Sequence, residues 1–140
     1  MSADDPVDEL TYPVIEFSRG ELVVIRDQHR LRRWTRAGLR NRWQDDLVIV
    51  DSSLRRWRVI QVRTHPDGLK GWMTGRLIAE LALGRTQTVT LDDVRREVLD
   101  VLRRHASLWQ ADGQLDERLE AVQRAGDISQ LVDALETDDP

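Results

Sequence analysis

The sequence predicts an α+β fold: an antiparallel sheet of four to five strands with one interposed helix and a helical C-terminal tail. Short runs rich in Val and Ile occupy the first half of the chain, and segments with a 3.6-residue apolar period occupy the second half. Only one helical pattern interrupts the strands. Strands that are followed by helices in a row favour α+β over an alternating α/β architecture.

The first predicted elements form a hairpin. Its strands cover residues 12–17 and 21–26, with a Gly-containing link between them. A helix is expected next, beginning at Asp27 or Gln28 and running to about Trp43. Two further strands are predicted at 47–51 and 56–63, joined by a turn in which Asp and Ser bond their own backbone. The continuous Leu-Val-Ile-Val run indicates a central strand that is covered on both faces.

The second half of the chain is predicted as a long loop followed by helices. Residues 64–75 hold one Pro and three Gly, which favours a loop. Residues 77–83 fit either a strand or a short helix, and the Thr-rich stretch that follows favours a strand. Thr90 is expected to cap a helix that runs to about residue 105. Further helices are expected around 115–122 and at 128–135, the last one capped by Asp127.

Length and composition limit the class of protein. The 140 residues fit one domain, which we expect to span residues 11–137 after a disordered acidic arm at residues 1–10. The absence of Cys excludes disulfides, thiolate metal sites and Cys nucleophiles. The first residues resemble no signal peptide, and the longest aliphatic runs are far shorter than a membrane span. We therefore expect a cytoplasmic protein with no membrane partner.

Catalytic and metal sites are not predicted. None of the three His residues, His29, His65 and His105, has a partner at a recognised zinc spacing. Paired acids do acid–base chemistry only where their environments separate their pKa values, and only Asp45 and Asp46 have a position suited to a cleft. We expect no enzyme activity, no metal and no cofactor.

The Gly-rich stretch at 68–75 is the first candidate for binding a partner. It offers Lys70, Trp72 and Met73 but lacks the Walker spacing that a phosphate loop needs. Two interpretations stay open: Trp72 covers the core beneath the loop, or it anchors a protein partner, because Trp is enriched in interface hot spots.

The predicted helix at 28–43 is the second candidate, this time for nucleic acid. It is rich in Arg, and Arg33, Arg36 and Arg40 share one face, with Trp34 and Trp43 interleaved. A solvated Arg-rich face explains the same pattern, and the net charge of −4 favours that interpretation. We therefore consider nucleic acid an unlikely partner, and keep a nucleic-acid-associated regulatory module as the alternative function.

The order of segments resembles that of small bacterial immunity proteins, which accompany secreted polymorphic toxins. The likeness rests on residues 12–17, 20–25, 47–52 and 56–60 and on the helical tail around 90–98, Trp109 and 124–135. The chain departs from that pattern at Leu54, where a turn Gly is common.

The resemblance implies a non-enzymatic cytoplasmic protein that binds one cognate toxin domain and occludes its active site. An acidic surface in the C-terminal half is suited to steering a basic partner toward the protein. We expect the contact either there or in the Gly-rich loop. The candidate residues are Lys70, Trp72, Met73, Asp112, Asp116, Glu117 and Glu120.

Overall fold

The computed structural model describes residues 9–18, 21–35, 46–105 and 115–135. These residues form a six-stranded antiparallel sheet in the order β2-β1-β4-β5-β6-β3. The α+β prediction is confirmed, with more strands than the four to five expected. The strands are β1 (Val14–Ser18), β2 (Glu21–Ile25), β3 (Arg33–Thr35), β4 (Val48–Val50), β5 (Arg55–Pro66) and β6 (Arg76–Thr88).

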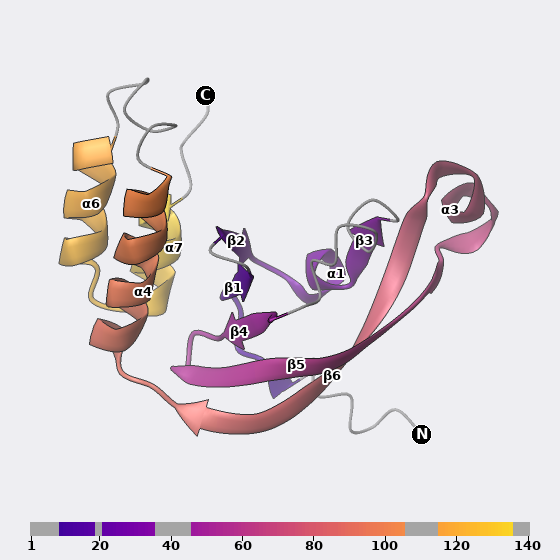
Figure 1. Ribbon diagram of the computed structural model, residues 1–140, viewed down its shortest axis with the longest axis horizontal. Coiled ribbons are helices and arrows are strands. Elements are labelled where there is room, and N and C mark those ends of the chain that lie inside the picture. The colour runs from indigo at the N-terminus through magenta and orange to yellow at the C-terminus, as the bar shows by residue number, and fades with distance from the viewer. Residues whose placement is uncertain (1–8, 19–20, 36–45, 106–114, 136–140) are drawn as a thin grey trace.

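The helices fall into two groups. Two short ones, α1 (Gln28–Leu31) and α3 (Gly68–Thr74), lie within the sheet-forming part of the chain. Three others, α4 (Leu91–Arg104), α6 (Leu115–Arg124) and α7 (Ile128–Leu135), stand side by side at one end of the molecule (Figure 1). No helix among the described residues combines the length and apolar composition that crossing a membrane requires.

Two apolar cores lie on opposite faces of the sheet, because strand side chains alternate between its faces. In β1, Ile15 and Phe17 pack against α4, α6 and α7, whereas Val14 belongs to the other core. In β4, Val50 joins the first core and Ile49 the second. We call these the helix-side and the far-side core. The expectation of a central strand covered on both faces is confirmed.

Polar contacts stabilise the start of α4 and connect the three large helices. Thr90 and Asp93 form a reciprocal capping box at the start of α4, which satisfies two orphan amide donors. The buried guanidinium of Arg118 on α6 donates to the carbonyl of Leu135 at 2.7 Å, near the end of α7. Burial lowers the pKa of Arg118. Arg95 on α4 donates to the carbonyl of Val122 on α6 at 3.2 Å.

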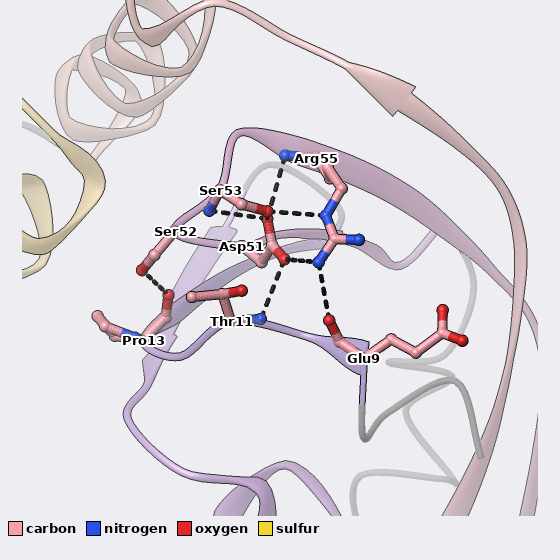
Figure 2. A network of polar contacts seen from close by, with 7 residues as sticks. All are labelled: Glu9, Thr11, Pro13, Asp51, Ser52, Ser53 and Arg55. Carbon is pink, nitrogen blue, oxygen red and sulfur yellow. Dashed lines mark hydrogen bonds and ion pairs between the residues drawn. The ribbon is translucent and has the colours of Figure 1, made fainter. Parts of the chain in front are cut away.

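The turn between β4 and β5 is organised by one buried carboxylate, that of Asp51 (Figure 2). It accepts hydrogen bonds from the backbone amides of Ser53 and Arg55, both at 3.1 Å, as the sequence predicts for this turn. It also accepts one from the amide of Thr11 at 3.0 Å, while Arg55 donates to the carbonyl of Glu9 at 2.8 Å. The network therefore attaches the segment before β1 to the sheet.

That attachment corrects the predicted boundary of the disordered arm at residues 1–10. Leu10 is buried in the far-side core, and Glu9 takes part in the network just described. Packing of Leu10 supplies the order that the acidic composition of the arm did not suggest. Residues 1–8 of the predicted arm lie outside the described residues.

Strands β5 and β6 form a long ribbon that extends beyond β1, β2 and β4, and α3 closes its end (Figure 1). The short strand β3 pairs with residues 76–78 of β6 at that same end. We call the distal part of β5 and β6 together with α3 the arm. Two register shifts interrupt the pairing, between Trp57 and Val59 and between Val59 and Gln61. Such bulges bend a ribbon and increase its twist. They lie at and just beyond residues 56–58 of β5, which pair with β4.

The arm corrects the prediction of a loop at 64–75. Residues 64–66 complete β5, and residues 68–74 form α3. Two of the three Gly residues that suggested a loop lie at the ends of this short helix, where Gly68 and Gly75 have positive φ values of 66° and 78°. The ambiguous segment at 77–83 is strand, because it pairs along β5 within β6.

Candidate functional site

The end of the arm is the best candidate for a binding site. The amide of Asp67 donates to the carbonyl of Arg76 at 3.1 Å, which closes the ribbon beneath α3. Gly71 is buried against that closure. A Cβ at this position would lie 2.7 Å from the Arg76 carbonyl oxygen, so only Gly lets the helix approach so closely. The arm therefore holds α3 in a defined orientation.

Three large apolar side chains of α3 point to solvent. Leu69, Trp72 and Met73 have exposed fractions of 77%, 62% and 73%. Their spacing of three and four residues places them on one side of the helix. We call this set the tip face. Most of the large hydrophobic residues that are exposed in the described chain lie here, and Lys70 is exposed on the same helix.

The exposure of Trp72 excludes one of its two interpretations. A side chain that is 62% exposed does not cover the core, so the core-covering interpretation is wrong. An exposed Trp beside two exposed aliphatic side chains is the composition expected of an interface anchor. Three of the predicted contact residues, Lys70, Trp72 and Met73, are thus brought together on α3.

The predicted acidic contact residues lie elsewhere. Asp116, Glu117 and Glu120 are exposed on α6, and Glu120 forms an ion pair with Arg124 at 3.3 Å. Helices α6 and α3 occupy opposite ends of the long axis of the molecule (Figure 1). The two groups of candidate residues therefore do not form one surface. Asp112 lies outside the described residues.

The predicted Arg-rich helix at 28–43 is confirmed at its start, where Asp27 caps α1, and is wrong for the described residues that follow Leu31. Helix α1 ends at Leu31, and Arg33 lies in β3, which pairs with β6. The carbonyl of Arg32 accepts a hydrogen bond from the amide of Ala79 at 2.7 Å, so pairing with a distant strand replaces the next helical turn. Arg36 and Arg40, the other two residues of the predicted face, lie outside the described residues.

The candidates for metal binding and acid–base chemistry are dispersed. His29, His65 and His105 belong to α1, to β5 and to the C-terminal cap of α4. Within the described chain, no group of three or more metal-ligating side chains comes together. Asp46 is exposed and lies 3.8 Å from Arg58, while Asp45 is outside the described residues.

One titratable residue was missed by the sequence analysis. Glu16 lies in β1 opposite Val23 of β2 and Ile49 of β4, on the face that carries the far-side core. Burial among these apolar neighbours raises its pKa from 4.5 to about 7. The signal that reveals Glu16 is its period-2 spacing from Val14, which predicts that both side chains share one face.

Comparisons with protein-family models, with curated proteins and with solved structures find no match for this chain.

Proposed function

We propose that this chain is a non-enzymatic immunity protein that acts in the cytoplasm by binding a cognate secreted toxin and occluding its active site. The observation that carries the proposal is the exposed tip face at the end of the arm. The resemblance of the segment order to immunity proteins supports it independently. An apolar helix face on a projecting ribbon is suited to entering the cleft of a folded partner.

The tip face supplies the affinity in this proposal. Burying Leu69, Trp72 and Met73 in a pocket of the toxin removes apolar surface from water, at about 25 cal/mol per Å². The short helix is held against the ribbon before binding, so little conformational entropy is lost when the partner docks. Lys70 beside these residues favours a toxin whose cleft has an acidic rim.

The acidic residues of α6 have a secondary role in the proposal. Because they lie far from the tip face, Asp116 and Glu117 act on the toxin through long-range attraction rather than direct contact. Such attraction changes the association rate and its salt dependence. Charge reversal at both positions is therefore expected to leave the dissociation rate unchanged.

The test uses the toxin domain encoded next to the gene for this protein. Trp72→Ala is expected to cost on the order of 2 kcal/mol of binding free energy, mostly through faster dissociation. The double variant of Leu69→Ser and Met73→Ser is expected to bind more weakly still and to lose protection of cells that express the toxin. Val23→Ser is the matched control, because Val23 is also an exposed apolar residue but lies in β2.

Two results would overturn the proposal. One is the absence of any complex between the wild-type chain and the adjacent toxin domain. The other is wild-type binding kinetics in the folded tip variants, which would place the contact on another surface.

A further inference from the structure

The arm has a second surface, distinct from the tip face, on the side of the sheet that faces the helices. Near the start of β5 this side is covered, because Arg56 bonds Glu97 of α4 at 2.9 Å. Val48, which pairs with Arg58, packs against the helix-side core. Farther along the ribbon the same side is open to solvent, and Ile60 is 66% exposed.

The strand register shows which side chains share this open side. Val62 and its partner Leu81 pack in the far-side core, so their neighbours Arg63 and Glu80 point the other way. His65 lies two residues beyond Arg63, and Arg76 lies on the same side of β6. Arg33 of β3 and His65 both pair with Ile78, which extends the row across three strands. We call this surface the arm face: Arg33, Arg58, Arg63, His65, Arg76 and Glu80.

The arm face is basic although the chain as a whole is acidic. It carries four exposed Arg residues, one exposed His and one exposed Glu. Among the described residues, Arg33, Arg63 and Arg76 form no salt bridge, and Arg58 has only the exposed Asp46 at 3.8 Å. These guanidinium groups are therefore available to an anionic ligand.

We propose that the arm face binds the phosphate backbone of nucleic acid without reading its sequence. The face is about 20 Å long, since a strand rises about 3.3 Å per residue, and a duplex carries one phosphate charge per about 1.7 Å of its axis, so the four Arg residues have room to contact separate phosphates. Arg also pairs with phosphate oxygens in a bidentate geometry. The arm face carries no Phe, Tyr, Trp or Asn side chain, and contacts from Arg to phosphate oxygens carry no sequence information, so we expect the binding to be independent of sequence.

An acidic protein would also match the positive charge of the arm face, but the arm face fits a protein less well than it fits nucleic acid. Protein interfaces place apolar or aromatic anchors at their centre, with charges at the rim. Among the described residues, this side of the sheet exposes one large apolar residue, Ile60, which lies between Arg58 and Arg63 along β5 and is too little for such an anchor cluster. Phosphate binding needs only the cations.

The test measures the anisotropy of a fluorescein-labelled duplex of about 20 base pairs and arbitrary sequence, with the full chain as titrant. Four Arg contacts predict a slope of log K against log salt of about −3.6. Affinity then falls about a hundredfold between about 50 and 200 mM salt. Arg63→Ala is expected to reduce the slope by about 0.9.

Glu80 provides a variant that is expected to strengthen the binding of the duplex. Glu80→Gln removes the one carboxylate of the arm face and is expected to raise affinity about threefold, since it removes a local repulsion from phosphate. Arg103→Ala is the matched control, because Arg103 is an exposed Arg on α4. It is expected to leave affinity and slope unchanged. Unchanged thermal unfolding of each variant shows that the fold is intact.

Three results would overturn the inference. The first is no binding of the duplex at about 50 mM salt. The second is an equal effect of Arg63→Ala and Arg103→Ala. The third is displacement of the duplex by poly-glutamate at equal charge concentration, which would assign the arm face to acidic proteins. None of these results bears on the toxin contact, because the variants used here leave Leu69, Trp72 and Met73 unchanged.

Discussion

The carboxylate of Asp51 accepts a hydrogen bond from the backbone amide of Thr11 at 3.0 Å, across forty residues of sequence. The same carboxylate lies 3.1 Å from the guanidinium of Arg55, which in turn stacks 4.9 Å from the centre of the Trp57 ring. One buried acid thus joins the segment before β1, the β4–β5 turn and the far-side core.

Asp51→Ala is expected to lower the free energy of unfolding by about 3–5 kcal/mol, because it leaves buried donors without an acceptor. Urea denaturation measures this difference. Asp133→Ala is the control: Asp133 forms an exposed ion pair with Arg26 at 2.9 Å, which contributes about 1 kcal/mol or less. Equal losses in the two variants would contradict a structural role for the network.

Glu16 is expected to make stability depend on pH in the direction opposite to a typical carboxylate. Its pKa is about 7 in the folded protein and 4.5 when unfolded, so the folded state holds the proton more tightly. Stability from Glu16 is fully present below 4.5 and is lost as pH rises toward about 7, by up to about 1.4 kcal/mol per pH unit.

Glu16→Gln removes this dependence. We expect the variant to gain stability relative to the wild type between about pH 5 and about pH 8, as measured by urea midpoints. Glu21→Gln, at an exposed position of β2, is expected to change neither the stability of the protein nor its dependence on pH. Parallel pH profiles of the wild type and Glu16→Gln would show that the burial of Glu16 has no energetic consequence.

At Leu54, the Gly variant is expected to be more stable than the Ala variant, which is the opposite of the usual order. Its φ of 63° lies in the left-handed region, which costs a non-Gly residue roughly 1–2 kcal/mol. Both substitutions lose the packing of Leu54 against the helix-side core, but only Gly relieves the backbone strain. Leu54→Gly is therefore expected to be about 1 kcal/mol more stable than Leu54→Ala in thermal or urea unfolding.

Leu99 provides the comparison for Leu54, since it also packs partly against the helix-side core but lies within α4. There the Ala variant is expected to be more stable than the Gly variant by about 1 kcal/mol. The same order at both positions would show that the positive φ of Leu54 carries no strain.

Gly71→Ala is expected to displace α3 from the end of the arm. The added methyl would lie 2.7 Å from the Arg76 carbonyl oxygen and 2.9 Å from the Asp67 Cβ, and overpacking of this kind costs about 1–3 kcal/mol. Amide exchange is expected to accelerate at Asp67, whose amide donates to the Arg76 carbonyl across the ribbon, and at Gly75, whose amide donates to the carbonyl of Gly71 itself.

The control for Gly71 is Gly126→Ala. The nearest atom to a Cβ there is Oε1 of the flexible Gln130 side chain, at 3.3 Å, so the expected change is within about 0.5 kcal/mol. Unaltered exchange in Gly71→Ala would contradict the close approach of α3 to the ribbon.

Several elements could be predicted from sequence alone because their signals are local. The apolar stripe of α4, with Val94, Val98 and Val101 buried, and its cap at Thr90 lie within one short segment. The β4–β5 turn likewise needs only Asp51 and its immediate neighbours. Such patterns depend on the 3.6-residue and 2-residue periods of the chain itself, so no distant contact is required to recognise them.

The interaction surfaces required the tertiary structure. Residues 33–35 became strand because their hydrogen-bonding partner is β6, more than forty residues away along the chain. The predicted loop at 64–75 is part of the arm, because β5 and β6 pair along nearly their whole length. This pairing exposes Leu69, Trp72 and Met73 at the end of the arm. The sequence by itself determined the residue types and their periodicity. Long-range strand pairing decided which of them are exposed together, since exposure depends on neighbours from distant parts of the chain.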